Sequence, residues 1–135
     1  MTLFVDTTVW SLALRRDTVP DIREVAALKN ALETGQSIAT TGCVLQELLQ
    51  GFSGPKAAGA IIERFRSLPL IVPDRQDYIE AAALRNQCRR SGVQTGTIDA
   101  LIAQLCMRHE LTLLTTDGDF KHIHTVMSNL RIWRA

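Results

Sequence analysis

The chain has 135 residues, 46% of them hydrophobic and 21% charged, with a formal net charge of +1. This composition is typical of a water-soluble globular protein and predicts one domain over residues 1–135 with a single core. It excludes a membrane-spanning chain, because no stretch is long and apolar enough, and we expect no membrane partner. The N-terminus has no basic region followed by a cleavage site, so we expect a cytoplasmic protein. A charge of +1 neither requires nor excludes a nucleic-acid partner.

Short apolar runs alternate with helical patterns along the chain. The predicted strands cover residues 3–5, 37–40, 70–72 and 111–114, with a candidate fifth at 130–133. The helical patterns run from 22 toward 35, from 44 toward 51, from 55 to 68, from 74 to about 91, and over 98–106. We expect Gly35 to end the first of these helices, Pro55 to stand in the first turn of the third, and Asp74 to cap the fourth.

Alternating strands and helices predict an α/β protein whose mostly parallel sheet is covered by helices on both faces. Right-handed crossovers then place the carboxyl ends of the strands at one edge of the sheet. Ligands of such sheets bind at that edge, close to the point where the strand order reverses. A functional site is therefore expected just beyond the strand ends.

The three cysteines are Cys43, Cys88 and Cys106. Their number is odd, they show no C-x-x-C spacing, and two of them fall within apolar helical patterns. We therefore expect reduced and mostly buried thiols rather than disulfides or a zinc site.

Four carboxylates recur where the sheet would bring them together. Asp6 ends the first strand, Asp117 follows the fourth by three residues, and Glu47 and Asp99 stand early in two helices. Each of them has an ordinary alternative explanation. Asp6 and Asp99 would suit helix N-termini, Glu47 an exposed surface, and Asp117 with Asp119 a turn. The functional interpretation depends on the set.

Converging carboxylates need a cation. Two of them about 5 Å apart repel by roughly 3 kcal/mol at an effective dielectric constant near 20. A site made only of hard oxygen ligands favours Mg²⁺ or Mn²⁺ over zinc. Such a metal activates water for attack on phosphorus, so metal-assisted phosphoester chemistry is the leading hypothesis. The hydroxyl groups of Thr8 and Thr115 are candidates for orienting the acids or their waters.

Four segments then resemble the PIN-domain nucleases, and in particular the VapC-type toxin ribonucleases of bacterial toxin–antitoxin pairs. VDTTVW at 5–10 is similar to the D-[TS]-[ST] start of the family, and ELLQG at 47–51 resembles its E-L-x-x-G segment. DALIA at 99–103 resembles D-x-x-I-A, and LLTTDGDF at 113–120 resembles the closing L-L-T-x-D-x-D-F. Each match alone is weak, but their order, spacing and chain length together are specific, and the resemblance covers essentially the whole chain.

The resemblance implies a three-layer α/β/α sandwich and an endoribonuclease that depends on Mg²⁺, with Mn²⁺ as a substitute. It assigns metal binding and catalysis to Asp6, Glu47, Asp99 and Asp117, and makes Asp119 an accessory metal ligand. It also implies an RNA substrate, a homodimer, and a VapB-type antitoxin encoded beside the toxin. Trp10 and Phe52 are candidates for a groove near the site, although burial in the core is the preferred interpretation.

RNA contacts are harder to place from the sequence. The chain has twelve Arg and three Lys, and guanidinium groups suit phosphate better than ammonium groups. The basic clusters are Arg15 with Arg16, Arg64 with Arg66, and Arg85 with Arg89 and Arg90. Arg85 and Arg89 share a helix face and are candidates for gripping phosphates, but a solvated helix face is the preferred interpretation. His122 and His124 lack a third ligand, so a structural zinc there is not favoured.

Three rival functions remain open at this point. A receiver-type signalling domain would want an acidic pair after the first strand, a phosphate-accepting Asp after the third and a Lys after the fifth. The chain has Asp74 after the third strand, but it has neither the acidic pair nor the Lys. A haloacid-dehalogenase-like phosphatase would want D-x-D after the first strand, where the chain has Asp6-Thr7-Thr8. The third rival, a non-catalytic PIN-like module that binds RNA or protein, would typically have lost acids that this chain keeps.

Overall fold

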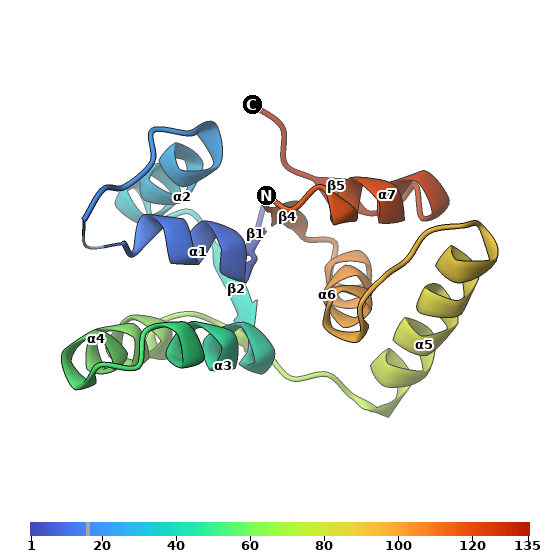
Figure 1. The fold of residues 1–135 in the computed structure, drawn as a ribbon, viewed down its shortest axis with the longest axis horizontal. Helices are drawn as coiled ribbons and strands as arrows, with labels where there is room; N and C mark the ends of the chain where they lie inside the picture. The colour runs from blue at the N-terminus through green and yellow to red at the C-terminus, as the bar shows by residue number, and fades with distance from the viewer. Residues whose placement is uncertain (16) are drawn as a thin grey trace.

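The structure, a computed structural model, describes residues 1–15 and 17–135, so Arg16 of the first basic cluster lies outside the described residues. Over these ranges the chain forms five strands and seven helices (Figure 1). The strands are β1 Leu3–Val5, β2 Ile38–Thr41, β3 Leu70–Ile71, β4 Thr112–Leu114 and β5 Arg131–Ile132. The helices are α1 Thr7–Ala13, α2 Arg23–Thr34, α3 Gly42–Gly51, α4 Pro55–Arg66, α5 Arg75–Arg90, α6 Thr97–Arg108 and α7 Asp119–Val126.

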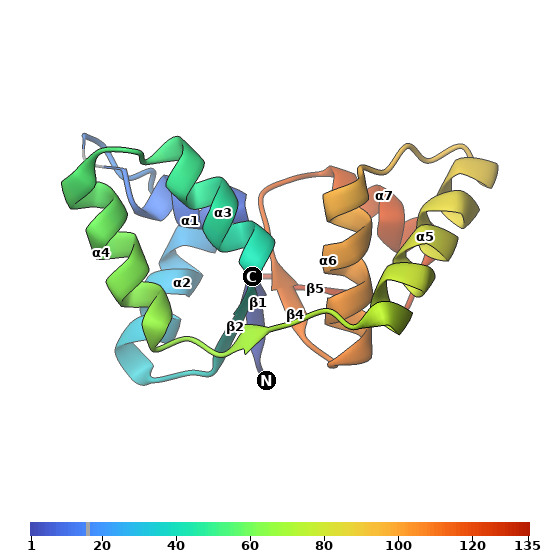
Figure 2. The same cartoon turned by 90° about the horizontal axis from the view of Figure 1, so that it is seen from below.

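The sheet is parallel throughout, with the order β3-β2-β1-β4-β5. β1 is central, so the chain builds one half of the sheet outward to β3 and then crosses back to build β4 and β5. Figures 1 and 2 show α1 to α4 on one side of the sheet and α5 to α7 on the other. The predicted three-layer α/β/α sandwich is confirmed, and the sheet is fully rather than mostly parallel.

The central strands are apolar because both of their faces are covered. All three residues of β1 are buried, as are Leu113 and Leu114 of β4. On the α1–α4 side Trp10 packs against Phe65, with ring centroids 5.0 Å apart. Trp10 is therefore a core residue, as expected, whereas Phe52 is only half-buried. Cys88 and Cys106 are buried, Cys43 is half-buried, and all three are free thiols, in line with the prediction.

The predicted helix boundaries follow from local chemistry. Gly35 ends α2 in the left-handed conformation with φ 71°, which a residue with a Cβ rarely adopts. Pro55 occupies the first turn of α4. Asp74 caps α5 through a reciprocal pair of hydrogen bonds with Asp77. No helix in the described parts of the chain is long and apolar enough to span a membrane.

Two helices are absent from the predicted elements. α1 has seven residues and α7 has eight, so neither offers two full repeats of an apolar stripe. Both begin directly at residues of the acidic segments, where polar side chains dominate the pattern. The apolar contacts of Val9, Trp10, Phe120 and Ile123 with the core determine that these segments are helical.

Candidate metal centre

The carboxyl ends of β1 and β4 bring two of the predicted acids to the same edge. These strands are parallel neighbours, with Val5 opposite Leu114. Asp6 follows β1 directly and its backbone N–H donates to the carbonyl of Leu114 at 3.1 Å. Asp117 follows β4 after a two-residue turn. The site lies at the edge of the sheet where ligands are expected.

Asp6 is the most buried of these acids, with 4% of its surface exposed. Its Oδ1 accepts from the Thr8 hydroxyl at 2.5 Å and from the Thr8 backbone N–H at 3.1 Å. Its Oδ2 accepts from the Thr115 hydroxyl at 2.6 Å. Burial raises the pKa of Asp6 above its ordinary value, although these hydrogen bonds oppose the shift. The two threonines therefore hold the carboxylate in one orientation.

Asp99, Asp117 and Asp119 form the tightest group of acids. One carboxylate oxygen from each lies within 4.8 Å of the others. Asp99 stands in the first turn of α6, and Asp119 begins α7. The Asp119 backbone N–H donates to Oδ1 of Asp117 at 2.9 Å, so the turn itself holds the two acids together. Three convergent oxygen ligands favour a hard divalent cation such as Mg²⁺ or Mn²⁺ over zinc.

Glu47 lies at the margin of this group. Its Oε1 accepts from the Thr7 hydroxyl at 2.9 Å, and its side chain is exposed on α3. Burial raises the pKa of Asp99 to about 6, and the negative charges of Asp117, Asp6, Asp119 and Glu47 add to the shift. The charges of the other four predicted acids therefore all influence Asp99. Of the five, only Asp99, Asp117 and Asp119 have carboxylate oxygens close enough together to bind one ion jointly.

The raised pKa of Asp99 predicts a pH-dependent stability of the metal-free protein. Because the pKa is about 6 in the folded state against an ordinary 3.8, the native state binds the extra proton between these values. The corresponding stability is fully present below about pH 4 and is lost as the pH rises through 6. Asp99 is half-buried, so screening limits the effect to roughly 1 kcal/mol.

We therefore expect Asp99→Asn to raise the Tm of the metal-free protein at neutral pH by several degrees. The variant should also remove most of the decline between mildly acidic and neutral pH. Thermal unfolding followed by circular dichroism in a chelator, at several pH values, measures both effects. Identical profiles for the two proteins would show that the carboxylates do not crowd Asp99.

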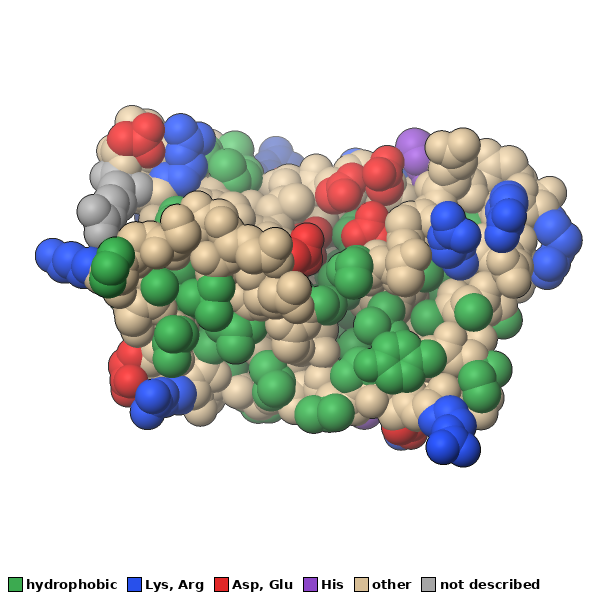
Figure 3. Space-filling model, turned by 60° about the horizontal axis from the view of Figure 1, so that its bottom comes forward, with side chains coloured by type: hydrophobic (Ala, Val, Ile, Leu, Met, Phe, Trp, Pro, Cys, Tyr) green, Lys and Arg blue, Asp and Glu red, His purple; other side chains and the backbone are tan. Residues whose placement is uncertain are grey.

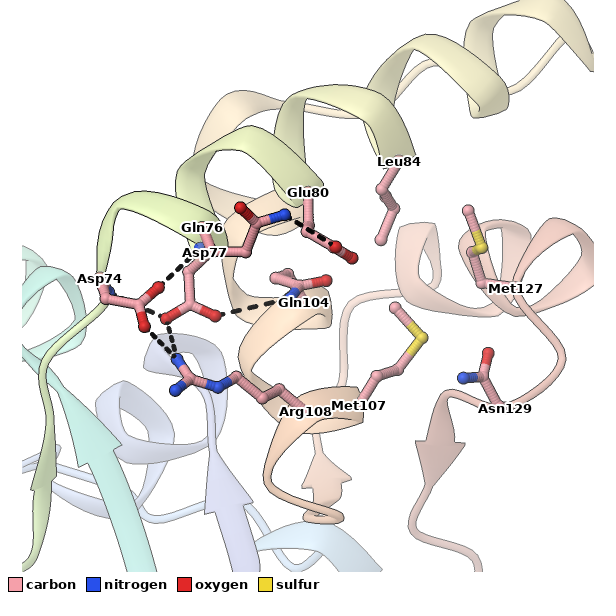
Figure 4. Close-up of a pocket in the computed structure, with 10 residues that line it drawn as sticks. All are labelled: Asp74, Gln76, Asp77, Glu80, Leu84, Gln104, Met107, Arg108, Met127 and Asn129. Atoms are coloured by element: carbon pink, nitrogen blue, oxygen red, sulfur yellow. Dashed lines mark hydrogen bonds and ion pairs between the residues drawn. The ribbon is translucent and has the colours of Figure 1, made fainter.

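A separate pocket of about 560 Å³ lies at the other end of α6 (Figure 4). Within it Arg108 pairs with Asp77 at 2.6 Å and with Asp74 at 3.1 Å. Nine residues separate Asp99 from Arg108, which places them about 13 Å apart along the helix. Asp74 is the predicted cap of α5, whereas Asp77, whose side chain is 1% exposed, was not predicted to have a role. Its spacing of three from Asp74, as in a capping box, was the available signal.

Thr7 and His124 make polar contacts that were not predicted. Thr7 was not singled out, yet its hydroxyl holds Glu47. His124 Nδ1 lies 2.8 Å from the carbonyl oxygen of Leu130, and Ile123 between the two histidines is buried in the core. His124 thus has a structural partner in the chain, and a zinc site with His122 remains unfavoured.

Fold and centre together define an α/β/α protein with an all-carboxylate centre at the carboxyl edge of a parallel sheet. The model of the PIN domain family matches residues 3–125. The chain belongs to the PIN domain family. None of the curated proteins matches the chain in sequence at a significant level.

Solved structures with the same fold include several toxin–antitoxin proteins. A chain of VapBC2 from Rickettsia felis, solved bound to a DNA fragment from its promoter, is 26% identical, with a TM-score of 0.75 over 98% of each chain. DNA-bound VapBC from Salmonella typhimurium gives 22% identity and a TM-score of 0.73, covering 98% of this chain and 97% of that one. VapC20 from Mycobacterium tuberculosis, described as a toxin that cleaves the sarcin-ricin loop, gives 19% and 0.66, covering 88% of this chain and 92% of that one.

Membership in the PIN family argues against the receiver-type and phosphatase hypotheses. A receiver domain would use an acid after the third strand as its phosphate acceptor. Here that acid is Asp74, whose side chain caps α5 and pairs with Arg108. It lies beside the pocket of Figure 4 and has no part in the carboxylate cluster.

Proposed function

We propose that the chain is a VapC-type toxin, one PIN-like nuclease domain over residues 1–135, that cleaves RNA with the help of Mg²⁺ or Mn²⁺. The convergence of Asp99, Asp117 and Asp119 to within 4.8 Å carries this proposal. The neighbouring carboxylates of Asp6 and Glu47 support it, because so many acids in one place are tolerated most easily with a cation. Such an enzyme acts in the cytoplasm, where its RNA is.

Each acid has a distinct part in the proposed chemistry. A bound Mg²⁺ or Mn²⁺ would make a water more acidic for attack on phosphorus and would offset the charge that develops on the leaving oxygen. Asp99, Asp117 and Asp119 would hold the ion, and Asp6, fixed by Thr8 and Thr115, would complete its surroundings. Glu47 is on α3, on the other side of the sheet from α6 and α7, and would orient a water or help to hold a second ion.

The proposed protein partner is a VapB-type antitoxin. The matching chains from Rickettsia felis and Salmonella typhimurium come from VapBC complexes, and a toxin of this kind must be neutralised in the cell that makes it. Because the proposed cleavage depends on the acids at 6, 47, 99 and 117, we expect the antitoxin to inhibit by blocking access to them.

Cleavage of total RNA by antitoxin-free protein tests the proposed function. We expect discrete fragments with Mg²⁺ or Mn²⁺ and none with EDTA, and the fragment ends would identify the target. The ion should also raise the Tm, because a ligand bound only by the native state stabilises it. Absence of both cleavage and metal-induced stabilisation would favour the non-catalytic PIN-like module.

We also propose a homodimer formed through β3 and the beginning of α5. β3 is an edge strand, so one side of its backbone has no neighbour within the sheet. Around it Leu70, Val72, Tyr78 and Ile79 are 48%, 75%, 56% and 54% exposed, and Figure 3 shows hydrophobic side chains on this face. A two-fold axis through such a patch would bury it against its own copy.

Mass measurement in solution checks this dimer. Sedimentation of the antitoxin-free protein should give twice the chain mass of 15.0 kDa. Val72→Asp places a charge at the most exposed of these four positions and should shift the protein to monomer without unfolding it. A wild-type protein that sediments as a monomer at micromolar concentration would contradict the proposed assembly.

A further inference from the structure

A groove of about 510 Å³ opens directly beside the carboxylate cluster. The carboxylate of Asp119 belongs to one wall and the C-terminal part of α5 to the other, with the segment 93–96 between them. We call it the arginine groove, because Arg85 and Arg89 line it together with Thr95, Gly96 and Asp119. Figure 3 shows positively charged side chains over this end of α5, to the right of the gathered carboxylates.

One arginine in each of the other two basic clusters is paired with a carboxylate. Arg15 pairs with Asp17 at 3.3 Å, and Arg66 with Glu63 at 3.6 Å. Among residues 1–15 and 17–135, neither Arg85 nor Arg89 makes a salt bridge with a carboxylate. Their positive charge is therefore available to a ligand.

Arg85 is also held in place. Its Nε donates to the carbonyl of Thr95 at 2.7 Å, which ties α5 to the segment that leads into α6 and Asp99. Arg89 stands one turn further along and donates to Oδ1 of Asn86 at 2.9 Å. A guanidinium with one N–H fixed in this way keeps its remaining donors ready for a second acceptor, and phosphate is the acceptor whose geometry matches them.

A second groove on the α2 side of Asp117 is a weaker candidate. Arg23, Lys121 and Arg134 line it, but Glu24 lines it too, next to Arg23. In the arginine groove Asp119 is the one carboxylate among the lining residues, and it belongs to the proposed metal centre. The arginine groove is therefore lined by no acid outside the proposed centre, whereas Glu24 lines the second groove.

We propose that the arginine groove binds the backbone phosphate of the nucleotide next to the scissile bond, and that Arg89 and Arg85 position the RNA strand. This inference rests on the proposed ribonuclease function and extends it to the substrate path. A cluster of five acids repels RNA, so the strand needs cationic contacts immediately beside it. Contacts with phosphate position a strand without reading its sequence.

Arg89→Gln tests the groove, with Arg90→Gln as the matched control. Both residues are exposed, adjacent in sequence and in the last turn of α5, but Arg90 does not line the groove. Both substitutions are made in Asp99→Asn protein, so that the RNA is bound and not cut. The probe is a short, labelled single-stranded RNA of mixed sequence, and its Kd is measured by fluorescence anisotropy at several salt concentrations in Mg²⁺.

We expect Arg89→Gln to weaken binding about fivefold to tenfold, as for one lost hydrogen-bonded contact. The slope of log K against log salt should fall by about 0.7, the value for one phosphate contact on a single strand. Arg90→Gln should change both quantities much less. If the parent protein binds RNA, equal effects of the two substitutions, or no effect of either, would contradict the proposed role of the arginine groove. Failure of the parent itself to bind RNA would instead overturn the proposed function, and the groove with it.

Discussion

Asp99→Asn should lower RNA cleavage by a factor of about 100 or more while the fold stays intact. Partners of metal ligands typically cost roughly 10-fold to 100-fold in affinity or activity when they are removed, and a direct ligand should cost at least as much. Asn keeps the shape of the side chain and one oxygen, so no cavity forms in the first turn of α6. The substitution should therefore weaken cation binding without disturbing the packing of the side chain.

The crowding of the site makes this variant diagnostic. Charges on Asp117, Asp6, Asp119 and Glu47 all act on Asp99, whose pKa rises to about 6. Removing the charge of Asp99 should therefore stabilise the metal-free protein and at the same time lower its affinity for the metal. A purely structural residue would not give this pair of opposite effects. A loss of activity with a lowered Tm would point to misfolding instead.

The control for Asp99→Asn is Glu110→Gln, which removes the same charge far from the centre. Glu110 is 79% exposed, just before β4, and its nearest cation is Arg131 at 4.0 Å. The Glu110→Gln variant should cleave RNA like the unchanged protein. Full activity in folded Asp99→Asn would contradict the assignment of Asp99, and equal activity that also survives EDTA would reveal a contaminating nuclease.

The sheet was predictable because its central strands are buried on both faces and read as short apolar runs. Short apolar runs between helical patterns, such as 3–5 and 111–114, are typical of buried strands. The helix ends were predictable at Gly35, Pro55 and Asp74 because each of these residues suits the backbone at a helix terminus. The segment 119–126 was not predicted as a helix, since it is too short for its periodicity to stand out. There the core contacts of Phe120 and Ile123 override a weak local signal.

The acids of the centre were predictable as a set because parallel strands end at one edge. Their individual distances were not. Asp119 joins Asp99 and Asp117 because its backbone N–H closes a turn on Asp117. Glu47 lies outside this group of three, and its carboxylate accepts a hydrogen bond from the Thr7 hydroxyl. Both arrangements depend on side-chain hydrogen bonds, about which residue spacing says nothing, so assigning the acids their separate roles remains a prediction.

Asp77 shows a stronger limit of sequence reasoning. A carboxylate in a helix is normally exposed, yet Asp77 is 1% exposed between α5 and α6. Its Oδ2 accepts from Arg108 at 2.6 Å and from the backbone N–H of Asp74 at 2.9 Å. Arg108 lies 31 residues away in the sequence, so no local sequence pattern predicts the ion pair between Asp77 and Arg108.

Asp77→Ala should therefore destabilise the protein by about 2 kcal/mol, a large share of the ordinary stability of a domain. The substitution leaves the Arg108 guanidinium, the Asp74 N–H and the Gln104 amide without their common acceptor. Burial acts to raise the pKa of Asp77, but the hydrogen bonds from Asp74 and Gln104 and the charge of Arg108 hold that pKa below its ordinary value. The stability it contributes is thus present above the ordinary pKa of an Asp and is lost as the pH falls through the lower, folded-state pKa.

Urea unfolding of Asp77→Ala and of Glu80→Ala separates this effect from simple loss of a charge. Glu80 lies on the same helix, lines the same pocket and is exposed, with the Gln76 amide 3.1 Å away (Figure 4). Its removal should change the free energy of unfolding by no more than about 0.5 kcal/mol. The proposed metal centre lies at the other end of α6, so folded Asp77→Ala should keep its response to Mg²⁺. Similar losses of stability in both variants would mean that the pair with Arg108 does not fasten α5 to α6.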